Sequence, residues 1–223
     1  MSNTFTVGSV QLRYSRLYHN EAYQNERSIE VALGRWFVEH SPKPLHAVTE
    51  PVIEVGCVLP YYGPTEHEVV DLADEHPSSR KVNALSLDYT GRRVLSISTI
   101  EHMQSSEYGN ASDEDSITFL RKVTSEAERY LVTWGIGYNP VLDAWVKVHP
   151  EIPRTFLFRR DWKNTYTQVS ESFEPSLGGK SVSIWDTPFG HSDRPIPAGY
   201  HNNANVVVLV TNVPELLAAE GVR

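Results

Sequence analysis

The hydrophobic positions of the chain form one helical pattern followed by a series of short, uniformly apolar runs. From about Tyr18 to His40, apolar residues recur at the spacing of an amphipathic helix, and the prolines of "SPKP" end it. The later runs are rich in β-branched side chains, which predicts strands. They are "PVIEVGC", "HEVVDLA", "RRVLSIST", "RYLVTWGI", "RTFLFRR" and "NVVVLVT".

A second helix is expected between the third and the fourth of these runs. "DEDSITFLRKVTSEAERY" carries acidic residues in its first turn and has Ile117, Leu120 and Val123 at helical spacing, which predicts a crossover helix. Strands that are apolar throughout indicate a sheet covered on both faces. The pattern therefore predicts an open α/β fold, with a mostly parallel sheet and helices on both faces.

The length of the chain sets its domain organisation. Its 223 residues can build one sizeable core. We expect a helical extension over residues 1–48 and a single α/β domain over residues 49–223. Residues 163–203 are dominated by turn residues, and so long an irregular stretch is either a lid or a set of missed elements.

Composition points to a cytoplasmic protein. No apolar run approaches the roughly 20 residues that span a membrane, and the first residues lack the basic-then-apolar pattern of a secretory signal. A single cysteine, Cys57, excludes an intramolecular disulfide framework and a cysteine-based zinc cluster, and it agrees with a reducing compartment. We expect no membrane partner.

The charge balance argues against a nucleic-acid partner. The chain has 20 basic and 28 acidic residues, and its net charge of −8 repels a polyphosphate unless a local basic face compensates. The sequence also lacks the "NPPY"-type run that amino-methylating nucleic-acid enzymes carry after the fourth strand.

Three acidic residues fall at or near predicted strand ends with even spacing: Glu54, Asp71 and Asp88. In an open α/β sheet, ligands bind outside the carboxyl ends of the strands. A carboxylate closing the second strand can accept both hydroxyls of a ribose, and one after the third can accept from an adenine amino group. The three acids together describe a nucleoside site, although each alone could be an ordinary cap or loop hydrogen-bonder.

The loop after the first predicted strand lacks a phosphate cradle. A pyrophosphate calls for several backbone N–H groups at the start of a sustained helix, but the loop holds only Gly56, and Pro60 and Pro64 leave no room for that helix. S-adenosylmethionine has a ribose and an adenine but carries a sulfonium cation instead of phosphates. A loop with nearby carboxylates therefore suits it.

Several of these segments together resemble a known family. "VIEVGCVLPYYGPTEHEVVDLAD", "VLSISTIEHM", "GIGYNPVLD", "NERSIE" and "NNANVVVLV" are similar, in order and approximate spacing, to class I S-adenosylmethionine-dependent methyltransferases associated with bacterial or phage glycan modification. The resemblance spans most of the chain and implies a Rossmann-like, seven-stranded sheet with the last strand antiparallel. The chain departs from the family in its sparse glycine loop, and the helix after the first strand is shortened to a turn.

The resemblance assigns a role to each matching residue, with the N-terminal extension as a cap over the cofactor site. Glu54 and Gly56 line the loop under the cofactor, Asp71 holds the ribose, Asp88 lies beside the adenine, and Ser98 and Thr99 face the methionine portion. The cofactor's carboxylate needs a cationic partner, and Arg27 is our candidate if the N-terminal helix folds over the site. The alternative for Arg27 is a surface pair with Glu30.

The catalytic candidates follow the fourth predicted strand. An alcohol needs a base to take its proton, and His102, with a pKa naturally near neutrality, is our candidate base beside Glu101. The alternatives are a histidine that only shapes the loop, or a divalent metal held by Glu101 and His102. We expect no metal, because two adjacent ligands are too few to define a site.

The expected acceptor is a hydroxyl of a sugar, sugar nucleotide or glycan, held by Tyr138 and Asn139 on a loop after the fifth strand. Pro140 would open the next helix, and a purely steric turn at Gly137 and Asn139 is the alternative. Further acceptor contacts could come from Trp185, His191, Tyr200 and His201. A small metabolite or protein acceptor, a non-catalytic binding module and a homodimer stay open.

Overall fold

A mixed sheet forms the centre of the molecule. The computed structural model describes residues 3–17, 19, 25–40, 52–103, 112, 114–152, 155–160, 165–169, 180–181, 203–204 and 206–217. Within these residues the main sheet has eight strands in the order β5-β4-β3-β6-β7-β12-β8-β9. The strands in chain order are β3 (Val52–Val55), β4 (Glu68–Asp71), β5 (Ser79–Lys81), β6 (Arg93–Ile97), β7 (Arg129–Gly135), β8 (Thr155–Arg160), β9 (Tyr166–Val169) and β12 (Val206–Thr211).

The sheet is mostly parallel. Strands β5, β4, β3, β6 and β7 run parallel to one another, whereas β12 is antiparallel to both β7 and β8, and β9 is antiparallel to β8. All six predicted strands are present, which confirms the α/β fold. The prediction of seven strands is wrong for the described sheet, because β9 adds an eighth strand at its edge.

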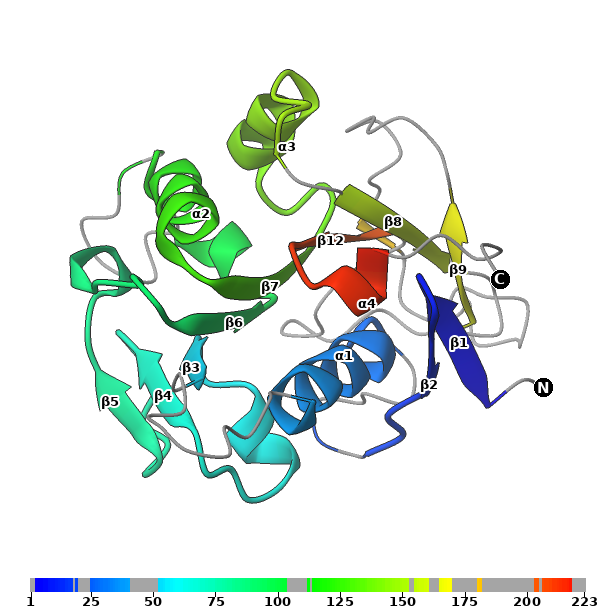
Figure 1. Cartoon of the computed structure of the whole chain (residues 1–223), viewed down its shortest axis with the longest axis horizontal. Helices are drawn as coiled ribbons and strands as arrows, with labels where there is room; N and C mark the ends of the chain where they lie inside the picture. Colours follow the sequence, from blue (N-terminus) through cyan, green and yellow to red (C-terminus); the bar gives the residue numbers. More distant parts are fainter. Residues whose placement is uncertain are drawn as a thin grey trace, which may run out of the picture.

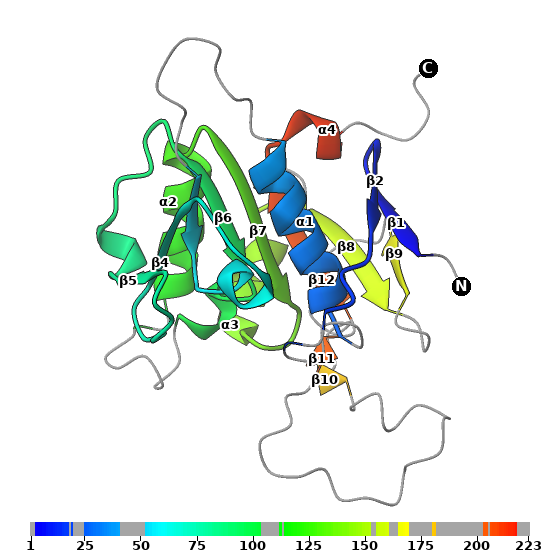
Figure 2. The same cartoon turned by 90° about the horizontal axis from the view of Figure 1, so that it is seen from below.

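Helices cover both faces of the sheet, as its uniformly apolar strands require. Figures 1 and 2 show α1 (Arg27–Glu39) on one face and α2 (Asp115–Glu126) on the other. Along β6, Leu95 and Ile97 pack on the side of α1, while Val94 packs on the side of α2. Two further helices, α3 (Pro140–Lys147) and α4 (Pro214–Leu217), join the faces of α2 and α1 respectively.

The N-terminal extension is only partly helical. It begins with a hairpin of β1 (Thr4–Val7) and β2 (Val10–Arg13), which the prediction of a helical extension did not include. The hairpin lies beside β9 (Figure 1), and the Tyr14 hydroxyl donates to the carbonyl of Tyr166 and accepts from its N–H. The alternating apolar residues of the β1–β2 hairpin pack into the core around α1.

Helix α1 confirms the helical pattern from Arg27 onward, and residues 18 and 20–24 lie outside the described residues. The irregular stretch 163–203 contains β9 and β10 (Lys180–Ser181), which pairs with β11 (Asn203–Ala204). Four proposed acceptor contacts lie outside the described residues: Trp185, His191, Tyr200 and His201. None of the helices described combines the length and the apolar character needed to cross a bilayer.

The elements at the carboxyl edge of the sheet are short. One turn of 3₁₀-helix, η2 (Leu59–Tyr62), follows β3, which confirms the predicted loss of a full helix there. Similar turns, η3 (Ala84–Ser86) and η4 (Ile100–His102), follow β5 and β6. Because β4 lies on one side of β3 and β6 lies on the other, the strand order reverses at β3 and β6, where a ligand crevice is expected.

Candidate functional site

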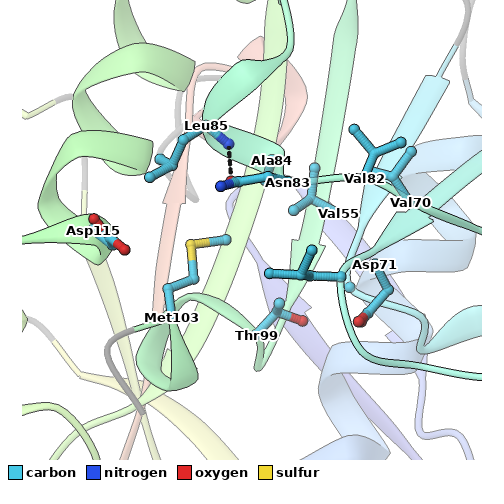
Figure 3. Close-up of a pocket in the computed structure, with 12 residues that line it drawn as sticks. Val55, Val70, Asp71, Val82, Asn83, Ala84, Leu85, Thr99, Met103 and Asp115 are labelled. Atoms are coloured by element: carbon cyan, nitrogen blue, oxygen red, sulfur yellow. Dashed lines mark hydrogen bonds between the residues drawn. The ribbon is translucent and has the colours of Figure 1, made fainter. Parts of the chain in front are cut away.

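A cavity of about 250 Å³ opens at this reversal of strand order. Its polar lining comes from four separate segments: Asp71 ends β4, Asn83 follows β5, Thr99 follows β6, and Asp115 begins α2 (Figure 3). Apolar side chains complete the walls: Val55, Val70, Leu72, Val82, Leu85 and Met103. The structure thus brings together three of the residues expected at a cofactor, namely Gly56, Asp71 and Thr99.

Gly56 is required by the close approach of two loops. Its φ of +90° lies in the left-handed region that favours glycine. A Cβ atom at this position would lie 1.8 Å from Thr99 Oγ1. The Thr99 hydroxyl is itself held by a 3.0 Å hydrogen bond to the carbonyl of Ile97. The floor of the cavity is therefore a fixed contact between the ends of β3 and β6.

The Asp71 carboxylate is held rigidly at the wall of the cavity. Its Oδ1 accepts from the N–H groups of Ala73 at 2.8 Å and Asp74 at 2.9 Å, and its Oδ2 accepts from Cys57 N–H at 3.1 Å. A carboxylate has about four acceptor sites, so one is left for a ligand. This geometry suits a donor such as a hydroxyl.

The loop after β3 has no free N–H group for a phosphate. Gly56 N–H donates to the carbonyl of Val70 at 2.8 Å, and Cys57 N–H donates to Asp71. The next two, Val58 and Leu59, donate to Glu54 Oε1 at 2.9 and 2.7 Å. Every N–H from residue 56 to residue 59 is therefore engaged within the chain, three of the four with the carboxylates of Glu54 and Asp71.

Glu54 is a structural residue of this loop and does not line the cavity. It is fully buried, and its second oxygen lies 2.7 Å from Nε2 of His67, whose side chain is also buried. The expected role of Glu54 in lining the cofactor loop needs correction, because its carboxylate fixes the loop from beneath. His67 was missed in the sequence, where it carries no motif of its own.

The structure does not bring Asp88 into the cavity. Asp88 is exposed between η3 and β6, and its Oδ1 accepts from Thr90 N–H at 2.9 Å, which lowers the pKa of its carboxyl. Asn83, Ala84 and Leu85 line the cavity instead, with Asn83 Oδ1 capping η3 through Leu85 N–H. The sequence hid this segment because β5, "SRK", is too short and polar to be recognised as a strand.

Ser98 faces α1 and not the cavity. Its hydroxyl lies 2.7 and 2.8 Å from the two carboxylate oxygens of Glu30, which is fully buried. Ser98 has a φ of 38°, the only positive φ among the described residues other than glycine. The expected contact of Ser98 with a methionine portion needs correction, because its side chain is committed to holding α1 against β6.

Arg27 lies at a second cavity beside the first. Its guanidinium donates to the carbonyl of Ile97 at 3.3 Å and contacts Glu30 at 3.4 Å, so it both pairs with Glu30 and reaches the carboxyl end of β6. The second cavity, of about 340 Å³, borders the other part of the β3 loop. Its lining comprises His19, Arg27, Cys57, Val58, Tyr61, Tyr62 and Asp74.

Neither Glu101 nor His102 lines the first cavity, although their neighbours Thr99 and Met103 do. Glu101 is 5% exposed, and its Oε2 has no hydrogen-bond partner. Burial and the nearby charge of Glu30 raise the pKa of Glu101 to about 8. His102 is half-buried, and its ring meets Tyr138 edge-on at 6.2 Å.

Asn139 caps α3 and cannot serve an acceptor as expected. It is fully buried; its Oδ1 accepts from Leu142 N–H and its Nδ2 donates to Ser116 Oγ, each at 2.9 Å. Pro140 opens α3, as predicted. Tyr138 is half-buried against the core around α1, and burial raises the pKa of its hydroxyl.

Among the described residues, no group of three or more histidine, cysteine, aspartate or glutamate side chains could hold a metal ion. Cys57 is buried, and burial with the nearby Asp74 raises the pKa of its thiol to about 12, so it is not a reactive thiolate. Comparisons of the chain with protein-family models, with curated proteins and with solved structures found no match.

Proposed function

We propose that the protein is a class I S-adenosylmethionine-dependent methyltransferase that methylates a hydroxyl of a sugar or glycan. One observation carries the proposal: the cavity at the strand reversal combines a fixed carboxylate, Asp71, with a loop whose N–H groups are all engaged. A phosphate would find no free N–H group at residues 56–59 of that loop. A nucleoside with a cationic tail meets both requirements.

The order of the strands supports the same class. If the edge strand β9 is set aside, seven strands remain, and β12, the last in the chain, is antiparallel between β7 and β8. This is the arrangement that the resemblance to class I methyltransferases implies. A likeness of fold does not by itself identify a reaction, so the proposal depends on the chemistry of the cavity.

The lining of the cavity fits the adenosine part of the cofactor. Asp71 would accept from the ribose hydroxyls, and the apolar side chains of Val82, Leu85 and Met103 would enclose the flat base. Arg27 would pair with the carboxylate of the methionine tail from the second cavity. The carboxylate of Asp71, at the wall of the cavity, favours a sulfonium cation.

The cofactor, when bound, supplies an activated methyl group. The chain's own residues would hold the acceptor in line with that group and remove its proton, for which His102 is the candidate base. His102 is half-buried on η4, and its neighbour Met103 lines the cavity, which supports its candidacy as the base. Glu101 is more deeply buried, and its raised pKa keeps it mostly protonated near neutral pH.

Calorimetry with S-adenosylmethionine tests the cofactor site. We expect binding by the unchanged protein and an affinity at least about tenfold weaker for Asp71→Asn, which loses a charge but little volume. Asp88→Asn is the matched control, because Asp88 is exposed and outside the cavity. We expect it to bind normally, and NAD should not bind. Thermal unfolding of both variants checks that they fold.

Two outcomes would count against the proposal. If the unchanged protein does not bind S-adenosylmethionine, or if the Asp71 and Asp88 variants behave alike, the cavity is not a cofactor site. Binding without transfer to any sugar, sugar nucleotide or glycan in a labelled-methyl panel would favour a non-catalytic binding module.

A further inference from the structure

A groove of about 380 Å³ lies on the outer side of α1, apart from both cavities of the proposed site. One wall is the segment that follows the β1–β2 hairpin, and the other is the exposed side of α1 (Figures 1 and 2). The two walls are held together by the hydrogen bond from Ser15 N–H to the carbonyl of Ser28, at 2.7 Å. The groove is therefore built on fixed backbone.

Three arginines from the two walls line this groove. Arg13 ends β2 and is exposed because its neighbours Leu12 and Tyr14 alternate into the core, and Arg16 follows on the same wall. Arg35 comes from α1 and donates to the carbonyl of Tyr62.

The lining includes one carboxylate, that of Glu39, so the groove is locally cationic on a chain whose net charge is −8. No carboxylate of the described residues pairs with Arg13, Arg16 or Arg35.

Several arginines elsewhere in the described structure pair with carboxylates. Arg80 and Arg92 both contact Glu68, and Arg129 contacts Glu215. Arg93 and Arg121 instead lie over the rings of Phe37 and Trp145. The groove differs in gathering three arginines that pair with no carboxylate of the described residues. Arginines that pair with no carboxylate, two on one wall and Arg35 on the other, suit an anion that can accept several N–H bonds, and phosphate is the anion that arginine binds best in this way.

Trp36 adds a flat apolar surface next to these cations. It is partly buried in the wall of the groove, and His40 stacks on its ring at a centroid distance of 4.9 Å. A tryptophan beside arginines can hold a sugar or a base next to its phosphate. The volume of the groove is within the range of small-molecule sites, about 300–1,000 Å³.

We propose that this groove binds the phosphate of a nucleotide or phosphorylated sugar, with Arg13, Arg16 and Arg35 on the phosphate and Trp36 against the ring. The proposal goes beyond methyl transfer and uses none of the residues of the proposed cofactor site. The two proposals can therefore be tested independently of each other.

Calorimetry at fixed ionic strength, with uridine diphosphate, pyrophosphate and uridine as probes, tests the groove. We expect the two phosphorylated probes to bind and uridine not to bind. The double change Arg13→Gln and Arg16→Gln should weaken both affinities by at least about tenfold. Both side chains are exposed and unpaired, so the variant should fold, which thermal unfolding checks.

Arg80→Gln is the matched control, because Arg80 is an exposed arginine that lies outside the groove and pairs with Glu68. We expect it to bind the probes normally. Failure of both phosphorylated probes to bind would overturn the proposal. A loss of affinity for the probes in Arg80→Gln as large as in the double variant would also overturn it. Binding of the polyanion heparin without binding of the probes would do the same, since either result indicates non-specific attraction by surface charge. Affinity for S-adenosylmethionine should not change in the double variant, which separates this groove from the cofactor cavity.

Discussion

At the scale of single residues, position in the fold separates side chains that look alike in the sequence. Asp71 and Asp88 are both aspartates that were expected at strand ends, yet Asp71 meets Gly56 and Thr99 at a cavity, whereas Asp88 is an exposed turn residue. Asp71 also bonds across the sheet edge to Cys57, while Asp88 bonds only to its near neighbour Thr90. The even spacing of these acidic residues along the chain could not predict the bond between Asp71 and Cys57.

Gly56→Ala tests the contact that forms the floor of the cavity. Alanine would be strained at a φ of +90° and its Cβ would meet Thr99 at 1.8 Å, so we expect a loss of stability of about 2–4 kcal/mol in urea unfolding. Gly91→Ala is the control: its φ is +65°, but nothing lies within 4 Å of the added Cβ, so about 1 kcal/mol is expected. Equal losses would show that crowding against Thr99 does not matter.

Glu101 should make stability depend on pH. Burial and Glu30 raise the pKa of Glu101 to about 8, above the unfolded value, so the folded state keeps its proton where the unfolded state loses it. The contribution of the protonated carboxyl to the free energy of unfolding is therefore fully present below about pH 4.5 and is lost as the pH rises to about 8. The loss is at most about 1.4 kcal/mol for each unit by which the folded pKa exceeds the unfolded one.

Glu101→Gln imitates the protonated carboxyl, so its melting temperature should fall less than that of the unchanged protein as the pH rises from 5 to 8. Glu66→Gln, an exposed glutamate, should keep the original profile. Parallel profiles for Glu101→Gln and the unchanged protein would contradict a raised pKa.

At the scale of elements, helix caps and short turns decide which side chains at the carboxyl edge of the sheet are free to bind a ligand. Helix α3 begins at Pro140 because Asn139 caps it, and the same amide reaches Ser116 on α2. That side chain joins two helices on one face of the sheet. A polar residue after a strand is typical both of a helix cap and of a ligand-binding residue, so Asn139 was expected to bind an acceptor. Only its hydrogen-bond partners in the structure distinguish the two roles.

Asn139→Ala should destabilise the protein without a direct effect on acceptor binding. It removes the cap and the hydrogen bond to Ser116 Oγ, so we expect a cost of about 2 kcal/mol in urea unfolding. Glu114→Ala is the control, because Glu114 precedes α2 without a side-chain cap bond. Normal stability together with weakened acceptor binding would restore the binding role.

At the scale of the whole molecule, the two sides of α1 have different chemistry. Its inner side joins the sheet through Ile29, Leu33 and Phe37, and its first turn brings Arg27 and Glu30 to the carboxyl edge. Its outer side contributes Arg35 and Trp36 to the cationic groove. A single helix therefore borders both the proposed cofactor site and the proposed phosphate site. The net charge of the chain does not predict the local charge of either site.

The sequence alone determined six of the eight strands of the main sheet, the main helices and the missing phosphate cradle. These depend on local causes: runs of apolar residues, helical spacing, and prolines such as Pro60 that exclude a long helix. Only the tertiary structure decided that the β1–β2 hairpin joins the edge at β9, that Glu54 turns beneath its loop to His67, and that Asp71 reaches the cavity without Asp88. Such contacts join segments far apart in the chain, and their energies depend on geometry that no local pattern encodes.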